Sequence, residues 1–184
     1  EETFHNQEIV AKAGFEANII ENHDQPRGAS LFIPEEDYGF YSLSALATII
    51  FCERGLPFLY QGQEIGMSNR QWKYDEFNDL ETINQYQIAL KAGMSKEQAL
   101  EIARHHSRDN ARTPMQWSSE ENAGFSKGKP WMPVNENYKV VNVAEEEKEY
   151  GSILNFYKRL IAFYKSEEYN KILTYGDFGK IYKK

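Results

Sequence analysis

The sequence predicts an α/β fold, because two short apolar stretches with the same layout flank a segment with helical character. Residues 15–20 (FEANII) and 56–60 (LPFLY) are apolar, and each runs directly into polar or glycine residues. Between them, residues 38–52 carry apolar side chains on nearly every face, as a helix buried against a sheet does. A strand, a helix and a strand joined over this length form a parallel pair with a right-handed crossover, the repeating unit of an α/β sheet or barrel.

Glycine and proline residues mark the ends of these first elements. Residues 3–12 have weak helical character, and Gly14 is expected to end that helix. Gly55 and Pro57 are expected to stop the helix over 38–52. Because an isolated pair of strands is unstable, the two strands need further packing partners.

Residues 78–106 predict an inserted helical segment with one interruption. The helix breaks at Gly93 and restarts at Ser95, where Ser95 and Gln98 have the spacing of a capping box.

The rest of the chain predicts an ordered loop, a further helix and a possible second domain. Residues 107–149 are mostly polar but contain Trp117 and Trp131, which need packing, so we expect an ordered loop and not a linker. Residues 172–182 have strand character. The helix predicted over 152–164 places its apolar residues on one stripe: Ile153, Leu154, Tyr157, Leu160, Ile161 and Tyr164.

Composition and charge limit the class of protein. With 184 residues, 41% of them hydrophobic and 14% aromatic, the chain is expected to be globular with a real core. A net charge of −7 argues against a nucleic-acid partner and favours an uncharged or acid-tolerant substrate. The longest apolar stretch, residues 43–51, is shorter than the roughly 20 residues that cross a bilayer, so no membrane partner is expected.

The single cysteine and the N-terminal residues indicate the cellular compartment. Cys52 cannot form an intrachain disulfide and is expected to be a small buried apolar residue. The first residues lack the basic start and apolar core of a signal peptide, so a cytoplasmic location is expected. They also lack a starting methionine, which suggests a piece of a longer chain.

Polar side chains gather where the first predicted strand ends. Asn22, His23 and Asp24 follow residues 15–20, and parallel α/β folds bind ligands at this end of their strands. A carboxylate beside an imidazole can hydrogen-bond a polyhydroxylated substrate and can support positive charge on a sugar ring. His23 and Asp24 could equally cap the following turn, and position alone favours neither interpretation.

Several motifs resemble one family. The string ENHDQPR at 21–27 resembles the fourth conserved region of the α-amylase superfamily, glycoside hydrolase family 13. LPFLYQGQEIGM at 56–67 resembles its eighth barrel strand, and SRDNARTPMQW at 107–117 resembles a signature of its α-glucosidase branch, of the oligo-1,6-glucosidase type. Residues 122–143 and the helix SILNFYKRLIAFYK at 152–165 also match, so the resemblance covers nearly the whole chain.

The resemblance implies a (β/α)₈ barrel, or TIM barrel, followed by a C-terminal β-sandwich. It assigns residues 1–168 to the C-terminal part of the catalytic barrel and residues 169–184 to the beginning of the β-sandwich domain. Barrel strands one to six would then lie outside this chain. The elements it assigns are strand seven at 15–20, helix seven at 40–52, strand eight at 56–60 and helix eight at 152–165.

The resemblance implies retaining hydrolysis, in which an aspartate attacks the anomeric carbon and a glutamate protonates the leaving oxygen. The resemblance places both residues on strands four and five, so the remainder of the same barrel is an expected partner and the chain alone is expected to be inactive. The implied substrate is a short α-glucoside cleaved from its non-reducing end, with α-1,6 linkages favoured. Sucrose, trehalose-6-phosphate and maltose-active relatives share these motifs, so the linkage stays open. No cofactor is implied.

The resemblance also assigns roles to residues. It makes Asp24 the carboxylate that stabilises the transition state, His23 a hydrogen-bond donor to the substrate, and Arg112 the arginine that grips the terminal glucose. Arg108 is the second choice for that last role. Without the motif, an arginine in a polar loop is most often a solvated surface charge.

Three further residues are interpreted as structural or as surface residues, and a fourth, Gln63, departs from the family pattern. Gln63 stands where relatives commonly have glutamate, and Glu64 is expected to be a hydrogen-bond partner of the barrel rim and not a catalytic group. His105 and His106 lack a third ligand at metal spacing, so no metal site is expected.

Two alternatives come from other functional classes. A non-enzymatic relative of the amino-acid-transporter heavy-chain type keeps the barrel and loses the catalytic residues, and the intact His23, Asp24 and Arg112 argue against it. A stand-alone subdomain that only binds sugar would lack most of a pocket wall.

Overall fold

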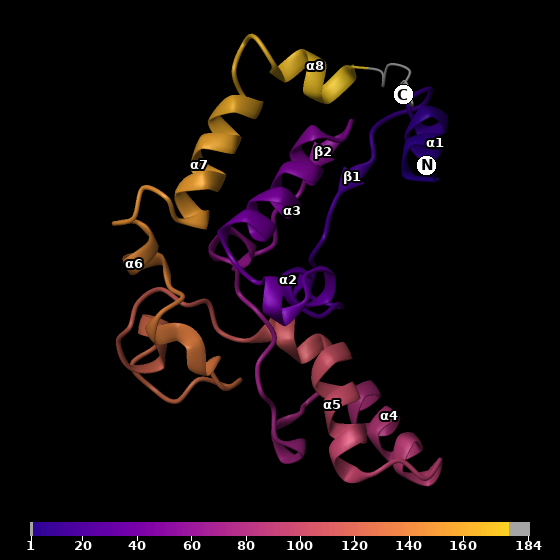
Figure 1. Ribbon diagram of the computed structural model, residues 1–184, viewed down its shortest axis with the longest axis vertical. Helices are drawn as coiled ribbons and strands as arrows, with labels where there is room; N and C mark the ends of the chain where they lie inside the picture. The colour runs from indigo at the N-terminus through magenta and orange to yellow at the C-terminus, as the bar shows by residue number, and fades with distance from the viewer. Residues whose placement is uncertain (1, 177–184) are drawn as a thin grey trace.

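The computed structural model describes residues 2–176 (Figure 1). The helices and strands are α1 (Glu2–Val10), β1 (Ala17–Asn18), α2 (Gly28–Phe32), α3 (Phe40–Cys52), β2 (Leu56–Pro57), α4 (Leu80–Lys91), α5 (Lys96–His106), α6 (Val143–Glu146), α7 (Ile153–Tyr164) and α8 (Asn170–Tyr175). Short 3-10 helices lie between them: η1 (Glu35–Asp37), η2 (Gln63–Ile65), η3 (Tyr74–Glu76), η4 (Arg108–Arg112), η5 (Glu121–Gly124) and η6 (Glu136–Lys139).

The strands β1 and β2 form a parallel pair, as predicted, with Ala17 opposite Leu56 and α3 crossing between them. Each strand has two residues, so the predicted strands over 15–20 and 56–60 were too long. The reason is that the ladder has few bonds: the Leu56 amide donates to the Glu16 carbonyl and the Phe58 amide donates to the Asn18 carbonyl, each at 3.0 Å. A strand extends only as far as its backbone groups are paired with a neighbouring strand.

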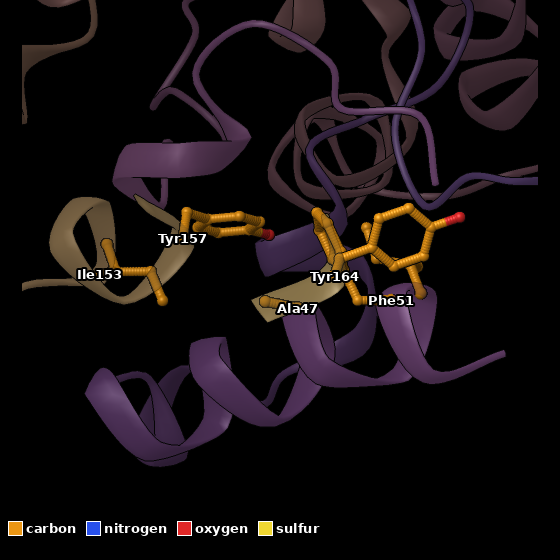
Figure 2. Close-up of a cluster of buried hydrophobic side chains, with 6 residues drawn as sticks. Ala47, Phe51, Ile153, Tyr157 and Tyr164 are labelled. Atoms are coloured by element: carbon orange, nitrogen blue, oxygen red, sulfur yellow. The ribbon is translucent and has the colours of Figure 1, made fainter. Parts of the chain in front are cut away.

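The main apolar core lies between α3 and α7 (Figure 2). Its buried members are Ala47, Ile50 and Phe51 from α3 and Ile153, Tyr157 and Tyr164 from α7. The Phe51 ring meets the Tyr164 ring edge to face, with centroids 5.6 Å apart, a favourable geometry for aromatic pairs. The Tyr164 hydroxyl donates to the Gly55 carbonyl at 3.0 Å, which joins α7 to the turn before β2. The helix predicted over 152–164 and its apolar stripe are confirmed.

The predicted helix over 38–52 is confirmed from Phe40 onward, but only one of its sides is covered. Tyr41 is 86% exposed and Ile49 is 52% exposed, although the apolar pattern predicted burial on nearly every face. Cys52 is also exposed, so its predicted burial is wrong. The physical reason is that α7 covers the side that carries Phe51, while Cys52, the next residue, points in another direction.

Two helix ends agree with the predicted signals. The helix predicted over 3–12 is α1, and the Gly14 amide still bonds the Val10 carbonyl at 2.9 Å beyond its last residue. The helix α3 stops three residues before Gly55, which has φ +129°. A Cβ atom at that glycine would lie 2.5 Å from the Glu16 carbonyl oxygen, so the close approach of the two strands requires glycine there.

The predicted inserted segment over 78–106 is a helical hairpin, α4 and α5, at the end of the molecule opposite α1 and α8 (Figure 1). The Gln98 amide donates to Ser95 Oγ at 3.2 Å and the Ser95 amide donates to Gln98 Oε1 at 3.0 Å, which confirms the capping box. Gly93 takes a left-handed φ of +93° where α4 ends, as the predicted break requires.

Residues 107–149 form an ordered loop of short helices, as predicted, but the packing of its tryptophans was predicted wrongly. Trp117 is 51% exposed and Trp131 is 79% exposed. Met132, the residue after Trp131, instead enters a buried cluster with Trp72 and Phe77, whose rings stack at 5.4 Å. The flexible methionine fills the core gap, so the neighbouring tryptophan points outward.

The strand character predicted for 172–182 is wrong over 172–175, which belong to α8. The helix α8 packs against α7 and the α3–α7 core. The Thr174 hydroxyl oxygen lies 3.1 Å from the Tyr164 hydroxyl, and Leu173 contacts the core. Residues 177–182 lie outside the described residues. The division between barrel and β-sandwich at 168/169 stays a prediction. Over residues 2–176, no helix combines the length and the apolar character needed to cross a membrane.

Candidate active site

The turn that follows β1 exposes two polar side chains. The Asp24 amide donates to Asn22 Oδ1 at 2.8 Å, and the Asn22 amide group donates to Gln25 Oε1 at 3.3 Å. Asn22 therefore caps this turn, which leaves the side chains of His23 and Asp24 available for other contacts. His23 Nε2 lies 3.2 Å from Asp24 Oδ2, and both side chains are more than half exposed.

Two arginines from η4 contact the carboxylate of Asp24. Arg112 Nη2 lies 3.1 Å from Asp24 Oδ1, and Arg112 Nε donates to the His23 carbonyl at 3.1 Å. Arg108 Nη1 also reaches Asp24 Oδ1, at 3.4 Å. The structure thus brings together all three predicted site residues, Asp24, His23 and Arg112, and adds Arg108, the second choice.

Two buried carboxylates, Asp79 and Asp109, lie behind these arginines, and neither was predicted as a site residue. Asp79 Oδ1 lies 2.7 Å from both Nε and Nη2 of Arg108, while Asp109 Oδ1 lies 3.7 Å from Arg112 Nη1. Burial alone would raise the pKa of Asp79, but hydrogen bonds from Arg108 and Thr82 outweigh it and hold that pKa below its usual value. Asp79 could have been found as the capping residue just before an amphipathic helix.

A buried ion pair joins the loops that carry the site. Arg27 Nη1 lies 3.3 Å from Glu21 Oε2, and both side chains are almost completely buried. Arg27 also donates to the Gln61 carbonyl at 2.7 Å and to the Asn110 carbonyl at 3.2 Å. Burial raises the pKa of Glu21 in spite of the neighbouring guanidinium. Arg27 therefore fixes the turn after β1 against the loop after β2 and against η4.

Asn110 anchors η4 from inside the protein. Its side-chain oxygen accepts from the Arg70 amide at 2.9 Å and from Trp72 Nε1 at 2.7 Å. Its side-chain nitrogen donates to the carbonyls of Arg104 and Ser107 at 2.8 and 2.9 Å. A fully buried amide with these four bonds has few other orientations open to it, so it holds the arginines on either side of it in register.

The residues after β2 have structural contacts. Glu64 Oε2 accepts from the Gly62 amide at 2.7 Å, which agrees with the structural role predicted for it. Gln63 is buried and donates to the Tyr157 hydroxyl at 2.9 Å. The rings of His105 and His106 contact each other edge to face at 4.7 Å, and residues 2–176 contain no group of three or more histidine, cysteine or acidic side chains arranged to hold a metal ion.

The chemistry open to this arrangement is substrate binding and charge stabilisation. A retaining glycosidase needs two carboxyl groups about 5–5.5 Å apart on either side of the bond that breaks. Asp24 presents one exposed carboxylate, and the other carboxylates of its network, Asp79 and Asp109, face arginines. Arginine and histidine donors beside Asp24 suit sugar hydroxyls.

Comparisons of the sequence with a family model and with known proteins indicate the same family. The model of the α-amylase catalytic domain matches residues 1–176. The oligo-1,6-glucosidase of Parageobacillus thermoglucosidasius is 39% identical over 177 residues, which cover 95% of this chain and 31% of that protein. The α-glucosidase of Candida albicans is 41% identical over 170 residues, covering 86% of this chain and 29% of that protein.

Solved structures agree with this chain in fold. Trehalose-6-phosphate hydrolase from Bacillus licheniformis superposes with a TM-score of 0.88 at 40% identity and covers 95% of this chain and 31% of its own. Isomaltulose synthase from Erwinia rhapontici gives a TM-score of 0.84 at 36% identity, again covering 95% and 31%. The chain spans less than a third of the length of these relatives. By sequence and by fold, the chain belongs to the α-amylase catalytic-domain family, whose members similar to it include oligo-1,6-glucosidases and α-glucosidases.

Proposed function

We propose that the full-length protein hydrolyses α-glucosidic bonds of short oligosaccharides and that this chain supplies part of its glucose site. The observation that carries the proposal is the convergence of His23 and Arg112 on Asp24 at the end of a parallel strand. In this proposal Asp24 stabilises the oxocarbenium-like transition state, because its negative charge lies where positive charge develops on the sugar ring. His23 and Arg112 donate hydrogen bonds to the hydroxyls of the bound glucose.

In the proposed barrel, β1 and β2 are the seventh and eighth strands, with α3 and α7 as the helices that follow them. The remaining barrel strands then supply the aspartate nucleophile and the glutamate acid. The reaction retains the anomeric configuration and releases glucose from the non-reducing end. The 184-residue chain alone is expected to have no activity, because it forms no glycosyl-enzyme intermediate.

The proposed linkage is α-1,6. Several of the similar proteins are named oligo-1,6-glucosidases, which supports this choice. Similar proteins are also named α-glucosidase and trehalose-6-phosphate hydrolase, so the substrate panel has to include other linkages. The alternative of a non-enzymatic heavy-chain relative finds no support among the relatives described above. The cytoplasmic location stays a prediction.

The test is glucose release by the purified full-length protein from isomaltose, maltose, sucrose and trehalose-6-phosphate. We expect the largest kcat/KM with isomaltose, and proton NMR of the first product should show the α-anomer. A larger kcat/KM with another disaccharide would overturn the linkage. Absence of hydrolysis with every substrate would overturn the enzyme proposal and favour a non-enzymatic relative.

A further inference from the structure

Arg108 is shared between two carboxylates of different exposure. Its Nε and Nη2 atoms hold Asp79 Oδ1 at 2.7 Å, and its Nη1 atom reaches Asp24 Oδ1 at 3.4 Å. The side chain of Asp79 is 4% exposed and that of Asp24 is 54% exposed. Arg112 approaches the same oxygen, Asp24 Oδ1, at 3.1 Å. Both arginines therefore bind one oxygen of Asp24, and the ion-pair contact of the other oxygen, Oδ2, within residues 2–176 is with His23.

Asp79 itself is fixed by contacts that leave one oxygen for Arg108. As the N-cap of α4, its Oδ2 accepts from the Thr82 amide at 3.2 Å and from the Thr82 hydroxyl at 2.7 Å. The Asp79 amide donates to Asp109 Oδ2 at 2.8 Å, and the Thr82 hydroxyl also meets Ser107 Oγ at 3.0 Å. The first turn of α4 is thus bonded to Asp109, within η4, and to Ser107, just before it. A carboxylate held in this way can fix a guanidinium plane.

The net charge of these carboxylates and arginines affects the proposed reaction. Two guanidinium groups beside a lone carboxylate would give the site a net positive charge, which disfavours a cationic transition state. Asp79 and Asp109 behind Arg108 and Arg112 leave one net negative charge among the three carboxylates and two arginines. The lowered pKa of Asp79, in which the Arg108 and Thr82 hydrogen bonds overcome burial, keeps that carboxylate ionised at neutral pH.

We propose that Asp79 is a positioning residue for the active site. It holds Arg108 so that Arg108 and Arg112 share Oδ1 of Asp24, and its own negative charge offsets the positive charge of Arg108, which leaves Oδ2 turned toward the substrate. The hairpin of α4 and α5 is then part of the catalytic apparatus, since its first turn supplies the anchor. The inference rests on the proposed function, because it assigns Asp79 an effect on the step that Asp24 stabilises.

The test uses the full-length protein and the substitution Asp79→Asn. Asparagine caps a helix as well as aspartate does, so its side-chain oxygen can keep the Thr82 contacts. The negative charge is lost, and an amide nitrogen that cannot accept from Arg108 replaces the oxygen that faces Arg108. We expect kcat to fall by roughly 10- to 100-fold with a much smaller change in KM, because the lost contact acts mainly in the transition state. The melting temperature should change little. Glu76→Gln is the matched control, since it weakens the Glu76–Arg70 pair, at 2.6 Å, in the same segment away from Asp24, and it should leave kcat unchanged.

A double-mutant cycle separates positioning from a general effect on folding. If Asp79 acts through Arg108, then Asp79→Asn in an Arg108→Ala background causes no further loss of kcat. Full additivity of the two losses would overturn the inference, and so would wild-type kcat in a folded Asp79→Asn variant. If Asp79→Asn does not fold, a folded Arg108→Ala variant decides: a fall in kcat supports the inference, and wild-type kcat overturns it.

Loss of activity in Asp24→Asn together with normal activity in Asp79→Asn refutes the positioning role alone. An inactive wild-type protein, or a fully active Asp24→Asn variant, refutes the proposed function as well.

Discussion

The α3–α7 core and the Asp24 site are held together by different kinds of contact. In the core, Phe51, Tyr157 and Tyr164 meet through apolar burial, which depends on area and only weakly on direction. At the site, Arg27, Asn110 and other buried polar groups make directional bonds between segments that are far apart in the sequence. A core of the first kind tolerates small changes of shape, whereas the loss of one partner in the second kind leaves a buried charge or polar group unsatisfied. Substitutions in the two regions should therefore differ in size and in what they affect.

The largest effect is expected at the buried ion pair. Arg27→Met removes the partner of Glu21 and the two bonds donated to the Gln61 and Asn110 carbonyls, so the unfolding free energy should fall by roughly 3–5 kcal/mol. Chemical denaturation of the full-length protein measures this. The double variant Glu21→Gln with Arg27→Met should be less destabilised than Arg27→Met alone, because it buries no unpaired charge. Equal destabilisation of the two variants would show that the pair matters only through its packing.

The next largest effect is expected on catalysis. Asp24→Asn keeps the size of the side chain but removes the charge proposed to stabilise the transition state, and kcat should fall on the order of 10²-fold or more. Asp24 is half exposed, so the melting temperature should change much less than for Arg27→Met. Steady-state kinetics with isomaltose checks the first expectation and thermal unfolding checks the second. A folded variant that keeps most of its kcat would remove the role assigned to Asp24.

A smaller effect is expected for Arg112→Lys. Arg112 uses Nε for the His23 carbonyl and Nη2 for Asp24, a forked geometry that a lysine ammonium group cannot reproduce. If Arg112 clamps hydroxyls in both the ground and transition states, KM should rise and kcat/KM should fall by roughly 1–3 kcal/mol equivalent. Arg108→Lys is the comparison, and we expect it to change kcat more than KM, since Arg108 faces Asp79 and Asp24. If Arg112→Lys mainly lowered kcat and Arg108→Lys mainly raised KM, the roles assigned to the two arginines would have to be exchanged.

The same contrast explains what could be predicted from the sequence. Periodicity indicated α3 and α7, and cap chemistry indicated the ends of α4 and α5, because these signals are local. The exposure of Cys52 and Trp131 and the helical state of residues 172–175 depend on which neighbours cover each face, which no local pattern encodes.

At the site, family motifs indicated His23, Asp24 and Arg112, which the structure brings together. The motifs did not indicate Asp79, whose side chain reaches the site through Arg108, 29 residues along the chain. Buried supporting residues of this kind are identified by three-dimensional contacts, since their own sequence surroundings resemble an ordinary helix start.

Glu146 is a polar anchor inside the apolar region, where it bonds α6 to the start of α7. Its Oε2 atom accepts from the Leu154 amide at 3.0 Å, and Leu154 is buried with Ile65, Met67 and Met115. Burial, with a further contribution from the negative charge of Glu64, raises the pKa of Glu146 from 4.5 to about 7. The folded state then holds more protons than the unfolded state between these two values, so the unfolding free energy should fall as pH rises through this window and level off above it.

The smallest expected effect is accordingly a gain in stability from Glu146→Gln that appears only at higher pH. The glutamine oxygen can still accept from Leu154, but no charge is buried, so stability should rise at pH 8 and stay unchanged at pH 4.5. Because the side chain is only partly buried, solvent screening reduces the gain to about 1 kcal/mol. Denaturation at the two pH values measures it. Glu145→Gln is the matched control, because Glu145 is exposed and pairs with Lys148 at 2.8 Å, and it should show no such pH-dependent gain. Two outcomes would show that the gain in stability does not come from removing a buried charge at Glu146. One is an equal change of unfolding free energy in both variants, and the other is a gain for Glu146→Gln that is the same at both pH values.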